Sequence, residues 1–141
     1  MQPRPLRWRL TMLAVIVAGL VTMWACSGPA PQAGAAPNPA FEAKVNAALD
    51  EIERRALADW AEYGREMLAD RRIGNSQAFD TLGMTFWVDG RGYIALRDEW
   101  EALDVGAAGE VLLEELFHLR TLILSHPQEL VDLLARYWVG E

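Results

Sequence analysis

The sequence predicts a mostly helical α+β domain, and three observations indicate this. Apolar residues recur three or four positions apart from residue 41 to residue 72, and apolar side chains dominate again after residue 107, as in amphipathic and core helices. Two short runs rich in aromatic and β-branched residues lie between these segments and are joined by glycines. A long N-terminal helix, one β-hairpin and two C-terminal helices are therefore expected.

The first 25 residues have the pattern of a secretory signal peptide. Three arginines before residue 10 form a positive region, and residues 10–25 follow as sixteen residues without a charge. Cys26 comes directly after this run and is the only cysteine in the chain. The run is short for a bilayer core about 30 Å thick, so we expect cleavage, with an uncleaved anchor as the alternative.

The residues around Cys26 resemble the lipobox of bacterial lipoproteins, a family in which this cysteine carries the lipid and becomes the first residue of the mature protein. Ala25 matches the small position before the cysteine, whereas Met23 and Trp24 differ from the usual leucine and small residue. The resemblance implies attachment to the membrane through acyl chains, such as palmitate, on Cys26. Because Ser27 rather than Asp follows the cysteine, it also implies the outer membrane, facing the periplasm.

Residues 26–40 are expected to form the lipidated cysteine and an extended tether. From residue 27 to residue 40 the chain has four Pro, two Gly and five Ala, and no charged side chain. Such a segment buries too little apolar surface to offset the entropy of ordering it. Residues 41–141 remain for a single globular domain, whose 101 residues are enough for one modest core.

The globular part is strongly acidic, and this limits the classes of molecule that it is expected to bind. The chain has 20 acidic and 13 basic residues, and three of the basic ones precede Cys26. The mature part therefore has ten basic residues against twenty acidic ones, and Lys44 is its single lysine. Binding of nucleic acid needs clustered lysine and arginine, so this class of partner is disfavoured and none is expected. A protein partner is expected instead.

Residues 41–72 are predicted to form one long amphipathic helix. Asn38 and Pro39 suit its cap and first turn, and Gly74 marks the exit. Its apolar positions are Phe41, Val45, Leu49, Ile52, Leu57, Trp60, Met67 and Leu68.

Residues 84–88 (MTFWV) and 93–96 (YIAL) are predicted to pair as a β-hairpin, since the glycines between them permit positive φ. A lone hairpin is marginal in water, so it must pack on helices or pair with a further strand that the sequence does not locate. Residues 97–103 are expected to follow as a short helix with Trp100 as its anchor.

Residues 107–125 are predicted to form the central helix of the core, because apolar side chains cover well over half of its circumference. Five of its polar side chains fall in one narrow stripe: Glu110, Glu114, His118, Thr121 and Ser125. His126 and Pro127 break the helix. The last helix is then expected to turn six apolar side chains inward, namely Leu130, Val131, Leu133, Leu134, Tyr137 and Trp138.

The central helix also contains an incomplete metal-binding motif. The segment from Glu114 to His118 (EELFH) matches the His-Glu-x-x-His helix of zinc peptidases at every element except the first histidine. Residues 85–123 resemble the edge strand and active-site helix of zincin metallopeptidases, which implies Glu115 as general base and Glu114 and His118 as metal ligands. A third ligand is needed. The candidate acid is Glu129, with Asp132 beside it on the last helix, and His126 is the only other histidine.

Other interpretations of these residues remain open. Di-iron helical bundles also use a Glu-x-x-His pair, but they need a second such pair, which this chain lacks. The simplest interpretation is that Glu114 and His118 form an i,i+4 pair on an exposed polar stripe in open solvent, with Glu115 at its edge and no metal or cofactor. Ser76 and Ser125 have no evident histidine–carboxylate partners for nucleophilic catalysis.

We therefore expect a membrane-anchored envelope lipoprotein whose small acidic domain binds a protein and does no catalysis. The alternatives are an envelope zinc metallohydrolase with an altered Glu-Glu-x-x-His site, and an inactive, metal-free relic of one.

Overall fold

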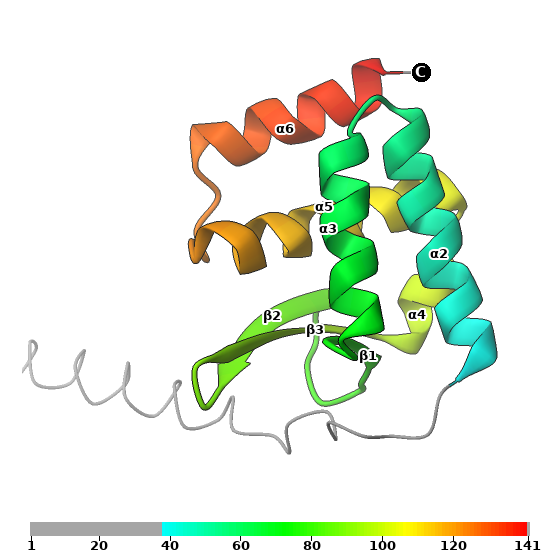
Figure 1. The fold of residues 1–141 in the computed structure, drawn as a ribbon, viewed down its shortest axis with the longest axis vertical. Coiled ribbons are helices and arrows are strands. Elements are labelled where there is room, and N and C mark those ends of the chain that lie inside the picture. The colour runs from blue at the N-terminus through cyan, green and yellow to red at the C-terminus, as the bar shows by residue number, and fades with distance from the viewer. Residues whose placement is uncertain (1–37, 141) are drawn as a thin grey trace, which may run out of the picture. The chain divides into compact units, whose positions relative to one another are not determined.

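A computed structural model describes residues 38–140, which form the predicted mostly helical α+β domain (Figure 1). The predicted signal peptide, Cys26 and nearly all of the tether lie outside the described residues. None of the helices in the described part is long and apolar enough to cross a membrane. The elements in chain order are α2 (Pro39–Arg54), α3 (Ala58–Ala69), β1 (Ile73–Asn75), β2 (Gly83–Val88), β3 (Arg91–Leu96), α4 (Asp98–Glu101), α5 (Val105–Thr121) and α6 (Gln128–Val139).

The predicted N-terminal helix is confirmed in part, because the structure divides it into α2 and α3. Asn38 caps α2 as expected, accepting a hydrogen bond from the Phe41 N–H at 3.2 Å. The helix ends where Ala56 takes a left-handed φ of 62°, and α3 then runs back alongside α2 (Figure 1). The left-handed conformation costs a residue with a Cβ about 1–2 kcal/mol. Burial of Leu57 and Arg55 on either side of the turn offsets this cost.

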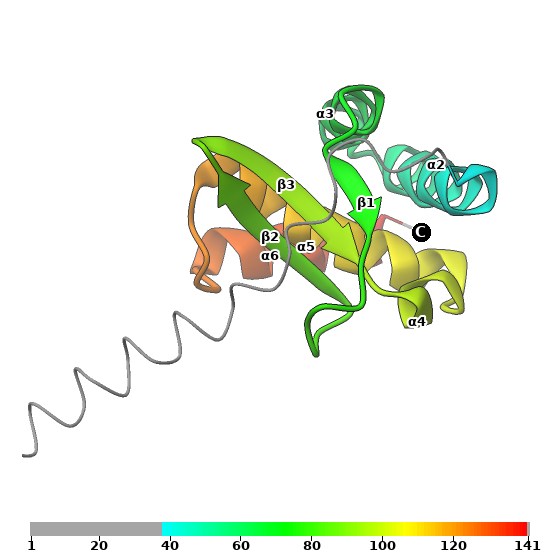
Figure 2. The same ribbon diagram turned by 90° about the horizontal axis from the view of Figure 1, so that it is seen from below.

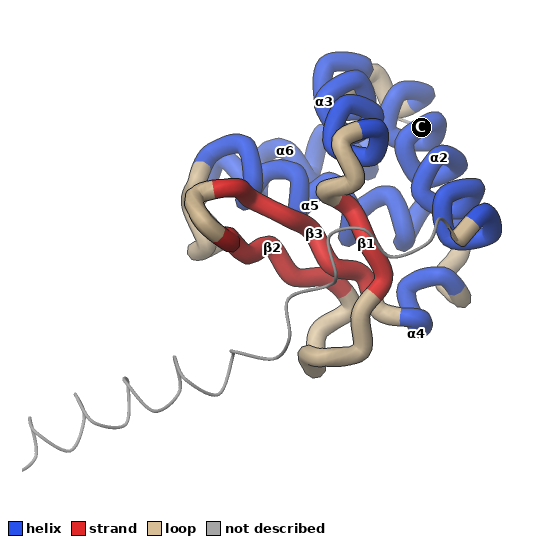
Figure 3. Tube along the Cα trace, turned by 60° about the horizontal axis from the view of Figure 1, so that its bottom comes forward, coloured by secondary structure: helices blue, strands red, loops and turns tan. Residues whose placement is uncertain are grey.

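The predicted hairpin is confirmed, and the structure supplies the strand that the sequence did not locate. β2 and β3 pair antiparallel, with Phe86 opposite Tyr93. They are joined by Asp89 and Gly90, both at positive φ, as a two-residue hairpin turn requires. β1 pairs parallel to β3 on its other edge, so β3 is central and β2 is an edge strand (Figure 3).

The central helix α5 lies between the sheet and α6, and most of the core gathers around it (Figures 1 and 2). It is shorter than predicted, because Leu122 takes a left-handed φ of 61° and ends the helix at Thr121. Trp100 of α4 is fully buried against this helix, as predicted.

The helix α6 buries only some of the six apolar side chains that were predicted to face inward. Its buried residues are Leu130, Leu133 and Tyr137, and Leu134 is half-buried. The prediction is wrong for Val131 and Trp138, which are 50% and 42% exposed. The reason is geometric: one side of α6 rests on α5, and Val131 lies one position further around the helix. The Trp138 ring lies at the edge of the contact, beside Gly106 of α5 and the Arg55 guanidinium.

Candidate functional site

The motif residues of α5 do not lie in open solvent. The side chain of His118 is 6% exposed and that of Glu114 is 30% exposed, while Glu115 is buried. The interpretation of this stripe as an exposed polar edge is therefore wrong. The edge strand β2 covers Glu115, and the α5–α6 connection, residues 122–127, returns over His118.

Glu115 is packed under the edge strand. The Thr85 hydroxyl oxygen lies 2.7 Å from Glu115 Oε2 and 3.0 Å from the Glu115 main-chain oxygen. A Cβ at Gly83 would lie 2.9 Å from the Glu115 Cγ, so the strand has no room for a larger residue there. The resemblance to zincins implies a general base at this position, but here the side chain is enclosed by β2 and held by Thr85.

The protonation of this carboxyl follows from its surroundings. Burial raises the pKa of Glu115, and the hydrogen bond with Thr85 and the electrostatic effect of His118 only partly counteract it. The Thr85 hydroxyl has one proton but two acceptor oxygens within reach. If the Glu115 carboxyl is protonated, it donates to the Thr85 oxygen, and Thr85 donates to the main-chain oxygen. This arrangement satisfies every group as a neutral pair.

His118 is fixed by the connection that follows its own helix. Its Nδ1 lies 2.5 Å from the main-chain oxygen of Ile123. A carbonyl oxygen can only accept, so Nδ1 carries a proton and donates. Glu114 Oε1 lies 3.8 Å from Nε2, which is beyond hydrogen-bond distance.

His126 is the residue that sequence reasoning left aside. Its Nε2 lies 2.9 Å from the same Glu114 oxygen, and its ring stacks on that of His118 with centroids 5.5 Å apart. One donor atom from each of Glu114, His118 and His126 lies within 4.8 Å of the other two. Glu129, the predicted third ligand, is exposed on α6 and is not part of this group. The available signal was that His126 is the only other histidine and follows closely after the helix.

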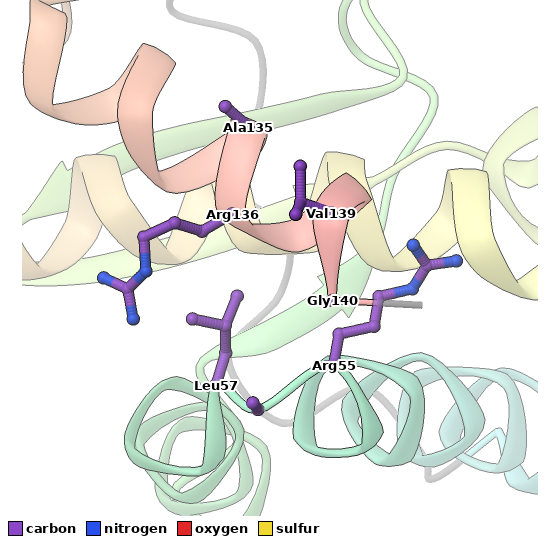
Figure 4. A pocket seen from close by; sticks show the side chains of 7 residues that line it. Arg55, Leu57, Ala135, Arg136, Val139 and Gly140 are labelled. Carbon is purple, nitrogen blue, oxygen red and sulfur yellow. The ribbon is translucent and has the colours of Figure 1, made fainter.

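A second feature lies at the other end of α6. An open hollow of about 360 Å³ is formed by the α2–α3 turn and the last turn of α6 (Figure 4). Its lining is Arg55, Ala56, Leu57, Ala135, Arg136, Val139 and Gly140. The Arg55 guanidinium is engaged with Glu51 and with the main-chain oxygen of Tyr137, so most of this surface is apolar.

Comparison with known protein families, with curated proteins and with solved structures finds no match for this chain. Its function is therefore inferred from its own residues.

Proposed function

We propose that this chain is a lipid-anchored protein of the bacterial cell envelope whose acidic domain binds another protein and carries out no chemistry. The observation that carries the binding role is a second, exposed apolar stripe on α6, next to the buried one. Val131, Ala135 and Trp138 are spaced four and three residues apart and are all exposed, and Val139 beside them is 84% exposed. The first stripe already covers α5, so the exposed part of the second stripe, which includes one face of Trp138 stacked by Arg55 on the other, is accessible to a partner.

The hollow described above adjoins this stripe through Ala135 and Val139, and the α5–α6 connection before the helix also has exposed apolar residues. Leu122 and Leu124 are 70% and 62% exposed in the connection that leads into α6, and Val139 also lines the hollow. Single exposed apolar residues are normal, whereas a contiguous set marks an interaction site. Tryptophan is also enriched among the residues that contribute most to binding. We call residues 122, 124, 131, 135, 138 and 139 the α6 surface.

The charge of the domain indicates what kind of partner fits. Acidic residues outnumber basic ones two to one after Cys26, and Glu129 and Asp132 lie on α6 itself. Net charge of one sign steers association with the opposite sign. The partner we propose is a protein with an apolar centre and a positively charged surround.

The competing function is an envelope zinc metallohydrolase, and the packing of Glu115 argues against it. A general base must be within hydrogen-bond reach of the water it activates. The carboxyl of Glu115 is instead bonded to Thr85 beneath β2. The proposal of a non-catalytic domain therefore fits this geometry better.

Cross-linking from the α6 surface tests the binding role. A photo-reactive amino acid at position 138 is expected to give, in intact cells, an adduct with a protein that has more basic than acidic residues. Val131→Glu should abolish the adduct, because it places a charge in the centre of the apolar stripe. The matched control is the same photo-reactive residue at Val88, which is 37% exposed at the tip of the hairpin and should give no such adduct. An adduct only with lipid or with a second copy of this chain would overturn the proposal.

Attachment through Cys26 is tested separately. Cys26→Ser is expected to abolish labelling by a fatty-acid analogue and to move the protein from the membrane fraction to the soluble fraction. One acyl chain binds a membrane only weakly, so stable attachment requires the several chains of a lipoprotein. Ser27→Ala serves as the control and should keep both label and location. If Cys26→Ser stays in the membrane fraction, residues 10–25 are an uncleaved anchor.

A further inference from the structure

The group formed by Glu114, His118 and His126 has one feature that a simple ion pair does not explain. Within the described residues, the Nε2 atom of the nearly buried His118 has no hydrogen-bond partner, although its Nδ1 is firmly bonded to Ile123. An imidazole that donates through one nitrogen to a main-chain oxygen has its tautomer and its ring direction fixed. Histidine ligands of metals are held in this way. His118 Nε2 lies 3.8 Å from the Glu114 carboxylate, and a donor atom of His126 belongs to the same group.

The same carboxylate oxygen lies beside both histidines. Glu114 Oε1 is 3.8 Å from His118 Nε2 and 2.9 Å from His126 Nε2. Ligands of Zn²⁺ lie about 2.0–2.2 Å from the ion, which requires donor atoms roughly 3.5 Å apart. The widest separation here is 4.8 Å, so an ion needs the group to close by about 1 Å. The side chain of His126 is 65% exposed on a connection, so it can make this movement without disturbing the core.

We propose that Glu114, His118 and His126 bind one divalent transition-metal ion, with Zn²⁺ the best match. Two imidazoles and one carboxylate suit Zn²⁺, whereas Mg²⁺ and Ca²⁺ prefer sets of oxygen ligands. The remaining position is available to water. The resemblance to zincins does not supply this donor set, since the third ligand is His126 of the connection and not Glu129.

The ion has a structural role in this proposal. His118 belongs to the last full turn of α5, and His126 precedes Pro127 and the start of α6. One ion bound to both residues fixes residues 122–127 against α5. That segment contains Leu122 and Leu124, so occupancy sets the shape of one end of the α6 surface. The metal site stands on the donor geometry alone and does not depend on the proposed partner.

The test is metal binding by the purified full chain in detergent, after removal of metal. Zn²⁺ titrated in competition with a chromophoric chelator should bind with one equivalent per chain, and Co²⁺ should give the visible absorption of a four-coordinate site. The midpoint of thermal unfolding should rise with Zn²⁺, because an ion that binds only the folded state stabilises it. Mg²⁺ and Ca²⁺ should give no shift.

His126→Ala is the decisive variant, because this exposed side chain can be removed without loss of folding. It should weaken Zn²⁺ binding at least tenfold, since even residues that only orient metal ligands affect affinity by about 10–100-fold. Glu129→Gln is the matched control and should bind Zn²⁺ as the parent does. Less than half an equivalent of Zn²⁺ in the parent protein, or affinity unchanged in His126→Ala, would overturn the proposal. Loss of binding in Glu129→Gln would show that the ligand set is wrong.

Discussion

Replacing Trp100 with alanine is expected to lower the free energy of unfolding by about 3–5 kcal/mol, the usual range for removal of a buried tryptophan. The side chain is fully buried, and its ring lies 6.1 Å from that of Phe41 at the start of α2. Its indole N–H donates to the main-chain oxygen of Ala108, 3.0 Å away in the first turns of α5. The short helix α4 therefore holds α2 and α5 together through one residue.

Denaturant unfolding of the parent and of two variants measures this effect. Trp100→Phe keeps an aromatic ring but loses the hydrogen bond and part of the volume, so its loss should be smaller, about 1–3 kcal/mol. A change below about 1 kcal/mol in Trp100→Ala would contradict the packing described for α4.

Replacing Arg55 with leucine is expected to lower the free energy of unfolding by about 3 kcal/mol, as breaking a buried charge pair does. Arg55 is 4% exposed and donates to Glu51 at 2.8 Å and to the main-chain oxygen of Tyr137 at 3.0 Å. Its guanidinium also stacks on the rings of Tyr137 and Trp138. This one side chain joins the end of α2 to the end of α6, and leucine can replace only its apolar stem.

Arg54 provides the matched control, since it is the neighbouring arginine and also pairs with Glu51. Its side chain is 57% exposed, so Arg54→Leu should cost less than about 1 kcal/mol. Comparable losses in the two variants would show that the buried position of Arg55 contributes nothing.

The pH dependence of stability gives a second measurement on the interaction of Glu51 with its arginine partners. The hydrogen bonds from Arg54 and then from Arg55, against an opposing effect of burial, lower the pKa of Glu51 to about 2. A lowered pKa in the folded state means that the ionised group stabilises the fold above the unfolded pKa, near 4.3, and that this contribution is lost as the pH falls toward 2. Between pH 5 and pH 2 the parent should therefore lose more stability than Glu51→Gln does.

The elements that the sequence predicted correctly are those whose cause is local. The cap at Asn38 and the hairpin turn at Asp89 and Gly90 depend on residues within a few positions of each other. Trp100 was found as an anchor because it is a large apolar residue in a short polar helix. The division of the chain into an export segment, a tether and an acidic domain stays a prediction from the sequence, since the structure describes only residues 38–140.

The elements that the sequence missed depend on contacts between distant parts of the chain. No Gly or Pro marks the break between α2 and α3. The left-handed Ala56 at this break is instead stabilised by burial of Arg55 and Leu57 on either side of it. The strand β1 has three residues, too few for a periodic pattern, and exists through its pairing with β3. The sequence predicted that Val131 and Trp138 of α6 face inward, although the structure leaves both exposed. Periodicity shows which residues share a face of a helix, but it does not show which face meets another element.

The sequence by itself determined that Glu114 and His118 lie one turn apart on a core helix, because the helical period places residues i and i+4 on one face. Only the tertiary structure decided what surrounds them. The left-handed Leu122 reverses the chain, so that Ile123 meets His118 and His126 returns to Glu114, while β2 closes over Glu115. These contacts depend on one backbone angle and on strand packing, and neither is encoded in the spacing of the motif. That is why the third donor of the candidate metal site was His126 and not Glu129.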